Sequence, residues 1–133
     1  MINAEKIVSE LIEVLEQNEY FSDKNIVPAF TRAVKPTVMK RVYIACGMLE
    51  LNADNSAVGE DVKAGSVKLF ADIYVPWKIT DFDMQQAVCK IVSGVEGFCI
   101  TSVYAGEQYQ DSDTQCIVQR VVLTISDIMN FES

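Results

Sequence analysis

The 133-residue sequence contains no histidine. Histidine is the usual general base beside a cysteine nucleophile and a frequent zinc ligand. Its absence removes the usual base from a cysteine-based active site and a common ligand from a zinc site. Four cysteines are scattered along the chain without the C-x-x-C spacing of a zinc site: Cys46, Cys89, Cys99 and Cys116. We expect them to be small core residues, kept reduced in the cytosol, rather than metal ligands.

The sequence also lacks a glycine-rich loop of the kind that cradles phosphates. Carboxylates or lysines could still support catalysis, but no pair of them has a spacing that marks an acid–base site. The sequence therefore predicts a protein that is not an enzyme. It nominates no catalytic, cofactor-binding or metal-binding residue and implies no cofactor.

Long apolar runs are missing as well. None approaches the ~18 residues that a membrane-spanning helix needs. Met1 leads straight into a glutamate-rich helical pattern instead of the cationic and apolar regions of a secretory leader, which favours the cytoplasm. Half of the residues are apolar and 23% are charged. This composition suits one folded domain that covers residues 1–133.

The net charge of −8 is unevenly distributed. The segment 24–41 carries five positive charges and no acidic residue, so the rest of the chain is −13. An acidic protein is unsuited to general nucleic-acid binding, which requires clustered lysine and arginine. Two interpretations of the segment stay open: a solvated basic loop, or a surface that meets an acidic neighbouring copy or passing DNA.

Hydrophobic periodicity predicts two helices and four strands. Asn3 caps an amphipathic helix with glutamates on its outer side, and Thr80 or Asp81 caps a second helix that ends at Gly94. Four segments are predicted to be strands: 41–51, 66–75, 98–108 and 115–126. We expect an α+β fold of two layers, with a four-stranded antiparallel sheet, both helices on one face, and the order α-β-β-α-β-β.

Two connecting segments differ in character. Residues 22–40 contain Pro28 and Pro36 and predict an irregular or short extended basic arm. Residues 52–65 are polar and acidic and predict a flexible flap, disordered alone and ordered on a partner. The first and last predicted strands are apolar on both faces, so the sheet face without helices needs a cover, either a partner or the basic arm.

The order of elements resembles the tail terminator (tail completion) proteins of long-tailed bacteriophages and phage-tail-like particles. The resemblance runs through the INAEKIVSELIEVLEQ helix, the RVYIACGMLEL and SVKLFADIYVP strands, the TDFDMQQAVCKIVSGV helix and the closing GFCITSVYAGEQYQDSDTQCIVQRVVLTIS hairpin. It implies a hexameric ring at the head-proximal end of the tail tube. Such a ring ends tube polymerisation and offers a docking face to the neck or head. The resemblance assigns no functional role to any individual residue of this sequence.

The implied partners are further copies of the chain, the tail tube protein, the sheath where one exists, and neck or head-completion proteins. DNA would pass through the ring without specific binding, and no membrane is involved. The protein would leave the host cytoplasm within the virion tail. Two other functions stay open: a neck or head-completion adaptor, and a small α+β ligand-binding or regulatory module.

Opposite charges suggest how copies would meet, with the basic arm against the acids of the first helix and the flap. The exposed pairs are weak singly, so only a network would matter. The residues assigned to this interface are Arg32, Lys35, Lys40, Arg41, Glu10, Glu13, Glu16, Asp54, Val58, Glu60, Asp61 and Val62.

Overall fold

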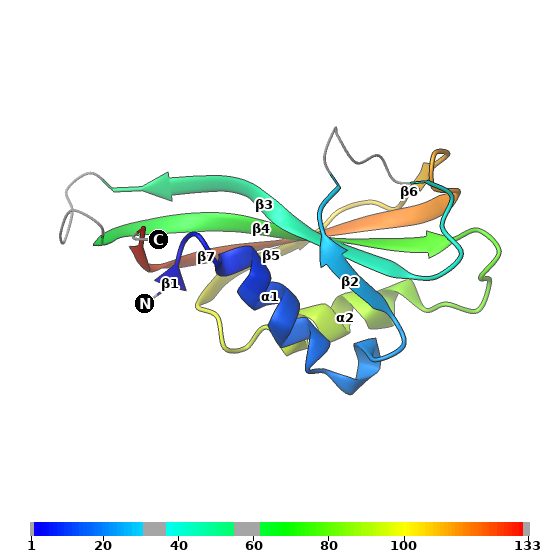
Figure 1. The fold of residues 1–133 in the computed structure, drawn as a ribbon, viewed down its shortest axis with the longest axis horizontal. Coiled ribbons are helices and arrows are strands. Elements are labelled where there is room, and N and C mark those ends of the chain that lie inside the picture. Colours follow the sequence, from blue (N-terminus) through cyan, green and yellow to red (C-terminus); the bar gives the residue numbers. More distant parts are fainter. Residues whose placement is uncertain (1, 31–36, 55–61, 132–133) are drawn as a thin grey trace.

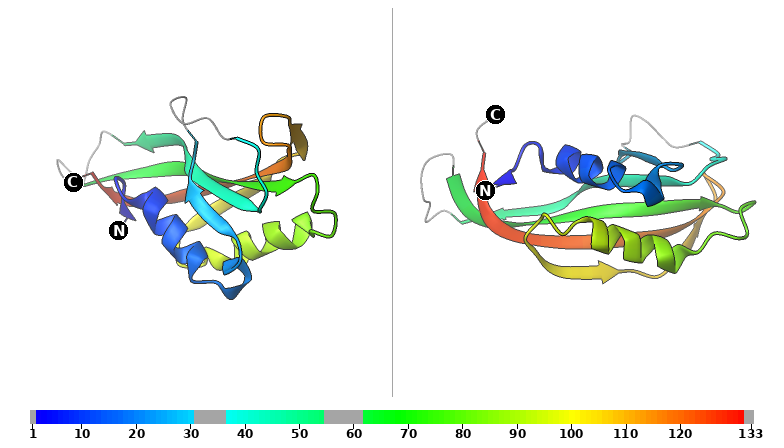
Figure 2. Two further views of the ribbon diagram at one scale, coloured as in Figure 1. Left: turned by 45° about the vertical axis from the view of Figure 1, so that its right-hand side comes forward. Right: turned by 90° about the horizontal axis from the view of Figure 1, so that it is seen from below.

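The computed structural model describes residues 2–30, 37–54 and 62–131. In this part of the chain, seven strands form one mixed sheet that curls strongly into a half-barrel, accompanied by two α-helices (Figure 2). The strands are β1 (Ile2–Asn3), β2 (Asn25–Pro28), β3 (Tyr43–Ala53), β4 (Val62–Pro76), β5 (Ile100–Ala105), β6 (Tyr109–Asp111) and β7 (Cys116–Asn130). The helices are α1 (Ile7–Glu16) and α2 (Met84–Gly94), and a short 3-10 turn covers Glu19–Phe21.

The prediction of a four-stranded antiparallel sheet in a two-layer α+β fold is wrong. The described chain is 48% strand and 21% helix. Strands follow the order β1-β7-β4-β3-β2, and β5 and β6 also pair with β7. Two of the pairings are parallel, β1 with β7 and β2 with β3.

The extra strands come from segments with little strand signal. β2 lies within the predicted basic arm, where Pro28 is tolerated because it ends a strand at the sheet edge. The predicted strand 98–108 is shortened to β5, and β6 lies in the segment after it, which was expected to be a turn. Between the two strands, Gly106 donates its amide to the Arg120 carbonyl and accepts from the Gln119 side chain. Asn3 is a strand residue, and its side chain accepts from the Glu5 amide.

The core lies between the sheet and the two helices, which cover the same side of the sheet (Figures 1 and 2). α1 buries Ile7, Leu11 and Leu15, while α2 buries Met84, Ala87 and Ile91. α2 is capped by Asp83, whose carboxylate accepts from the Gln86 amide, and not by Thr80 or Asp81. Alternate residues of β4 and β7 complete the core: Val67, Leu69, Ala71, Ile73, Val75, Val121, Leu123 and Ile125.

The predicted flap is shorter than residues 52–65. β3 and β4 pair as far as Ala53 and Gly65, and β4 continues back to Val62 through its pairing with β7. Strand pairing thus orders the two flanks of the flap, while residues 55–61 lie outside the described part. The hairpin formed by β3 and β4 extends past α1, so neither helix covers its far part (Figure 1).

Candidate assembly surfaces

The titratable and metal-ligating side chains of the described residues are the first possible site. No group of three or more potential metal ligands occurs among them. Burial raises the pKa of the Cys46 thiol to about 12, which makes the reactive thiolate scarce at neutral pH. Burial likewise raises the pKa of Cys116. These two thiols are core residues, whereas Cys89 and Cys99 are exposed.

An ion pair between a buried aspartate and a partly exposed arginine lies on the sheet face opposite the helices. The Arg120 guanidinium donates to both carboxylate oxygens of Asp72, at 2.7 and 2.9 Å. Its Cζ lies 4.2 Å from the centroid of the Phe70 ring, and the Asp72 side chain is only 6% exposed. The hydrogen bonds that Arg120 donates to Asp72 raise the pKa of the guanidinium. We interpret this pair as structural, because both Asp72 carboxylate oxygens already accept hydrogen bonds from Arg120.

An aromatic group surrounds that pair. The Phe30 and Tyr74 rings meet edge to face, with their centroids 5.7 Å apart. Phe30 of the predicted arm thus covers part of this sheet face. Burial, together with the negative charge of Asp72, raises the pKa of Tyr74 to about 12. The same two causes raise the pKa of Tyr109. Both hydroxyls are therefore protonated at neutral pH.

The first candidate surface is the far edge of β3, residues 48–53. β2 pairs with β3 only along Tyr43–Cys46, and within the described residues β4 is the only strand that pairs with the rest of β3. All six residues of this edge are exposed. Three of them carry large apolar side chains, with exposures of 38%, 46% and 39%: Met48, Leu49 and Leu51.

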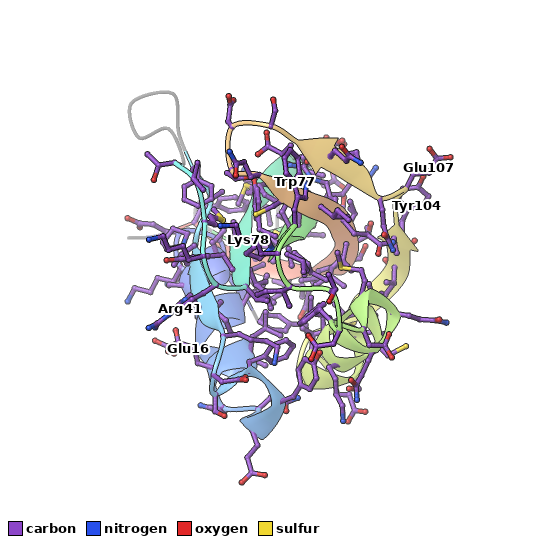
Figure 3. All side chains as sticks on the ribbon, turned by 90° about the vertical axis from the view of Figure 1, so that its right-hand side faces the viewer. Glu16, Arg41, Trp77, Lys78, Tyr104 and Glu107 are labelled. Carbon is purple, nitrogen blue, oxygen red and sulfur yellow. The ribbon has the colours of Figure 1, made fainter. Side chains whose placement is uncertain are left out.

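The second candidate surface is β5, at the opposite margin of the sheet (Figure 2). Among the described strands it pairs with β7 alone. Every residue from 101 to 105 is exposed. Val103 is 40% exposed and Tyr104 is 66% exposed, and Tyr104 projects from the margin of the molecule in Figure 3. The two apolar edges differ in sequence and lie on different strands.

A third surface lies where β3 begins and β4 ends. Trp77 is 43% exposed there and borders a hollow of about 370 Å³ together with Lys40 and Lys78. Figure 3 faces this end and shows Trp77 beside Lys78, with Arg41 further to one side. Exposed cations beside an aromatic ring suit an acidic partner. We call this surface the basic end: Lys40, Arg41, Trp77 and Lys78.

Lys24 does not belong to the basic end, although it contributed to the charge of the predicted arm. Its Nζ donates to the Asp23 carboxylate at 2.9 Å and to the Tyr20 carbonyl at 3.0 Å. The same atom lies 4.1 Å from the centroid of the Tyr20 ring. Since its side chain is only 11% exposed, this charge is used inside the subunit.

The predicted interface residues are dispersed. Glu13 and Glu16 are exposed on α1, whereas Glu10 is half-buried. Asp54 follows β3, its amide donating to the Ala64 carbonyl, and Val62 is the half-buried first residue of β4. No ion pair among the described residues joins Lys40 or Arg41 to these acids. Five predicted residues lie outside the described part: Arg32, Lys35, Val58, Glu60 and Asp61.

Sequence reasoning missed the two apolar edges, and it missed Trp77 and Lys78. A usable signal was present in ITSVYA, the sequence of β5, which has no charge and no proline. Exposed edge strands normally carry charged residues or proline, which prevent pairing with the edge of another chain.

No protein-family model matches the sequence, and no curated protein matches it significantly. None of the helices described here has the length and apolar composition needed to cross a membrane.

Proposed function

We propose that the protein is a structural subunit whose copies join head to tail into a closed ring. The observation that carries this proposal is the presence of two different apolar strand edges on opposite margins of one sheet. A contact between two unlike surfaces leaves one of each free, so it repeats until rotation closes the ring. A contact between like surfaces would stop at a dimer.

We further propose that this ring is the tail terminator of a long-tailed phage or a tail-like particle, with six copies. The resemblance of the sequence supports this assignment. In this function one face of the ring binds the last ring of the tail tube and prevents further subunits from adding. The other face receives the neck or head, and the protein ends in the virion tail.

The first test is the mass of the purified protein, measured by light scattering over a wide range of concentrations. We expect a concentration-dependent rise from one copy to six without a stable dimer. The second test adds the protein to growing tail tubes and measures tube length by electron microscopy. Short tubes with a ring at one end support a terminator. A ring that leaves tube length unchanged would favour the neck or head-completion adaptor, and a strict monomer that ignores tube ends would contradict both.

A further inference from the structure

The four central strands alternate in direction. β3 pairs antiparallel with β4, β4 with β7, and β7 with β5. The outer strands β3 and β5 therefore run in opposite directions. Rotation about an axis that runs along the strands leaves each strand direction unchanged, so β5 of one copy would meet β3 of the next copy antiparallel.

The two free edges also lie at the same level of the sheet. The register joins Met48 to Leu69, Leu69 to Leu123, and Leu123 to Val103. Leu69 and Leu123 are completely buried in the core, whereas Met48 and Val103 at the ends of this row are 38% and 40% exposed. Residues in one cross-strand row share a face of the sheet. The apolar layer thus reaches both margins and is left open at each.

The next rows show the same match. Leu51 joins the buried Val67 and Ile125, and the row ends at Ile100. The two edges share these levels over 48–51 and 100–103, and each has one irregularity there, at Leu49 in β3 and at Thr101 in β5. Neither segment contains proline or lysine, the residues that commonly prevent edge-to-edge pairing. The one charge is that of Glu50, whose carboxylate lies 3.9 Å from the Lys68 ammonium.

We infer that the far edge of β3 in one copy pairs antiparallel with β5 of the next copy, so that the sheet continues from subunit to subunit. This inference rests on the proposed function and names the contact that closes the ring. Main-chain hydrogen bonds would supply much of the affinity, as in other cases of strand addition. The partially exposed side chains at both ends of each row would complete the apolar layer between copies.

The inference is tested with two lysine substitutions and one matched control. Leu51→Lys places a charge on the β3 edge, and Val103→Lys places one on β5. Each should raise the concentration needed for half-assembly at least ~10-fold, because an unpaired charge would be buried in the contact. The control is Val92→Lys on α2, where a valine of similar exposure, 37%, lies away from both edges. It should assemble like the original protein.

Mixing the two edge variants gives the sharper result. The Leu51→Lys copy keeps an intact β5, and the Val103→Lys copy keeps an intact β3 edge. Each variant alone should remain a monomer, but an equimolar mixture should form a dimer and stop there. A mixture that stays monomeric would overturn the inference. So would a dimer formed by either variant alone, because it would show pairing between like edges.

Hydrogen exchange of the unsubstituted protein provides a test that does not depend on how the variants fold. Assembly should slow amide exchange within 48–53 and 100–105 and leave β2 unchanged. If rings form without this protection, or if both lysine variants still form rings, the ring proposal stands and the edge pairing is wrong. If the unsubstituted protein neither assembles nor binds tube ends at any concentration, the proposed function fails together with the inference.

Discussion

One part of the β3 margin is paired with another strand, and the other part is open. Over Tyr43–Cys46 the margin is covered by β2, and the amide of Ala29 extends this cover to the Cys46 carbonyl. Beyond Gly47 the margin is open, and the apolar side chains of 48–53 face solvent. The covered part completes the core, while the open part has no covering strand within the described chain. The open part is the surface that we propose to meet another copy, because it combines an unpaired strand edge with exposed apolar side chains.

The largest expected effect comes from breaking the ion pair between Asp72 and Arg120, which lies on strands next to the covered part of β3. Arg120→Met removes the partner of the buried Asp72 carboxylate and should lower the free energy of unfolding by about 3 kcal/mol, since a buried charge is left uncompensated. Urea denaturation measures this loss. Adding Asp72→Asn to the same chain should recover part of the stability. Equal stability for the single and double variants would show that the ion pair does not matter to the fold.

The second prediction concerns the junction between the covered and open parts. A Cβ at Gly47 would lie 2.6 Å from the Phe70 ring and 2.9 Å from the Ala29 Cβ. Gly47→Ala should therefore destabilise the protein by roughly 1–3 kcal/mol through overpacking. Gly97→Ala is the matched control, because no heavy atom lies within 4 Å of a Cβ at that position. Thermal unfolding of the two variants should separate them clearly.

The third prediction uses pH to weaken the covered part of the sheet. The folded protein holds the protons of Cys46 and Tyr74 more tightly than the unfolded chain, since burial raises the pKa of each to about 12. Their contribution to stability is complete below the unfolded pKa values, about 9 for the thiol and 10 for the phenol, and is lost as pH rises towards 12.

Within that window each group should reduce the free energy of unfolding by up to about 1.4 kcal/mol per pH unit. The measurement is urea denaturation at several values between pH 8 and 11, values on the order of those where the two groups begin to titrate. Cys46→Ala should make the decline shallower from about pH 9 upward. A decline of unchanged slope in this variant would show that the thiol is not the group responsible.

The smallest effect concerns the basic end. Lys40→Glu combined with Arg41→Glu should leave unfolding unchanged and weaken assembly or tube binding by at most ~30-fold, since two exposed pairs contribute about 0–1 kcal/mol each. The effect should shrink as salt increases. Lys6→Glu, an exposed change beside α1, is the control. If salt does not alter the difference, the basic end acts through something other than charge.

Sequence patterns predicted the parts of the fold that depend on local periodicity. The two helices and most of β3, β4 and β7 fall within or overlap the expected segments. The four-strand topology was wrong because β2 contains proline and β1 has two residues, so both depend on neighbouring strands. Gly65 and Asn52 have low strand propensity and lie in the predicted flap. They are nevertheless strand residues, because Asn52 pairs with β4 and Gly65 pairs with β3 and β7.

The assembly surfaces were harder to predict. An apolar residue such as Leu51 has the same pattern in a covered strand and in an open one, because exposure depends on where a neighbouring strand ends. The predicted charges were visible in the sequence, but their use was not: Lys24 is engaged within the subunit, while Lys78 joins the basic end from a different segment. Both the exposure of an apolar strand and the partners of a charged residue depend on contacts between segments that are far apart in the sequence.

The position of β7 has a consequence for synthesis. This strand pairs with β4 along one side and with β1, β5 and β6 along the other, yet it comes last among the described strands. At roughly 5–20 residues per second, several seconds separate the emergence of β4 from that of β7. During that interval the apolar face of the β3–β4 hairpin lacks its central neighbour. The nascent chain therefore exposes this apolar surface until Cys116–Asn130 has left the ribosome.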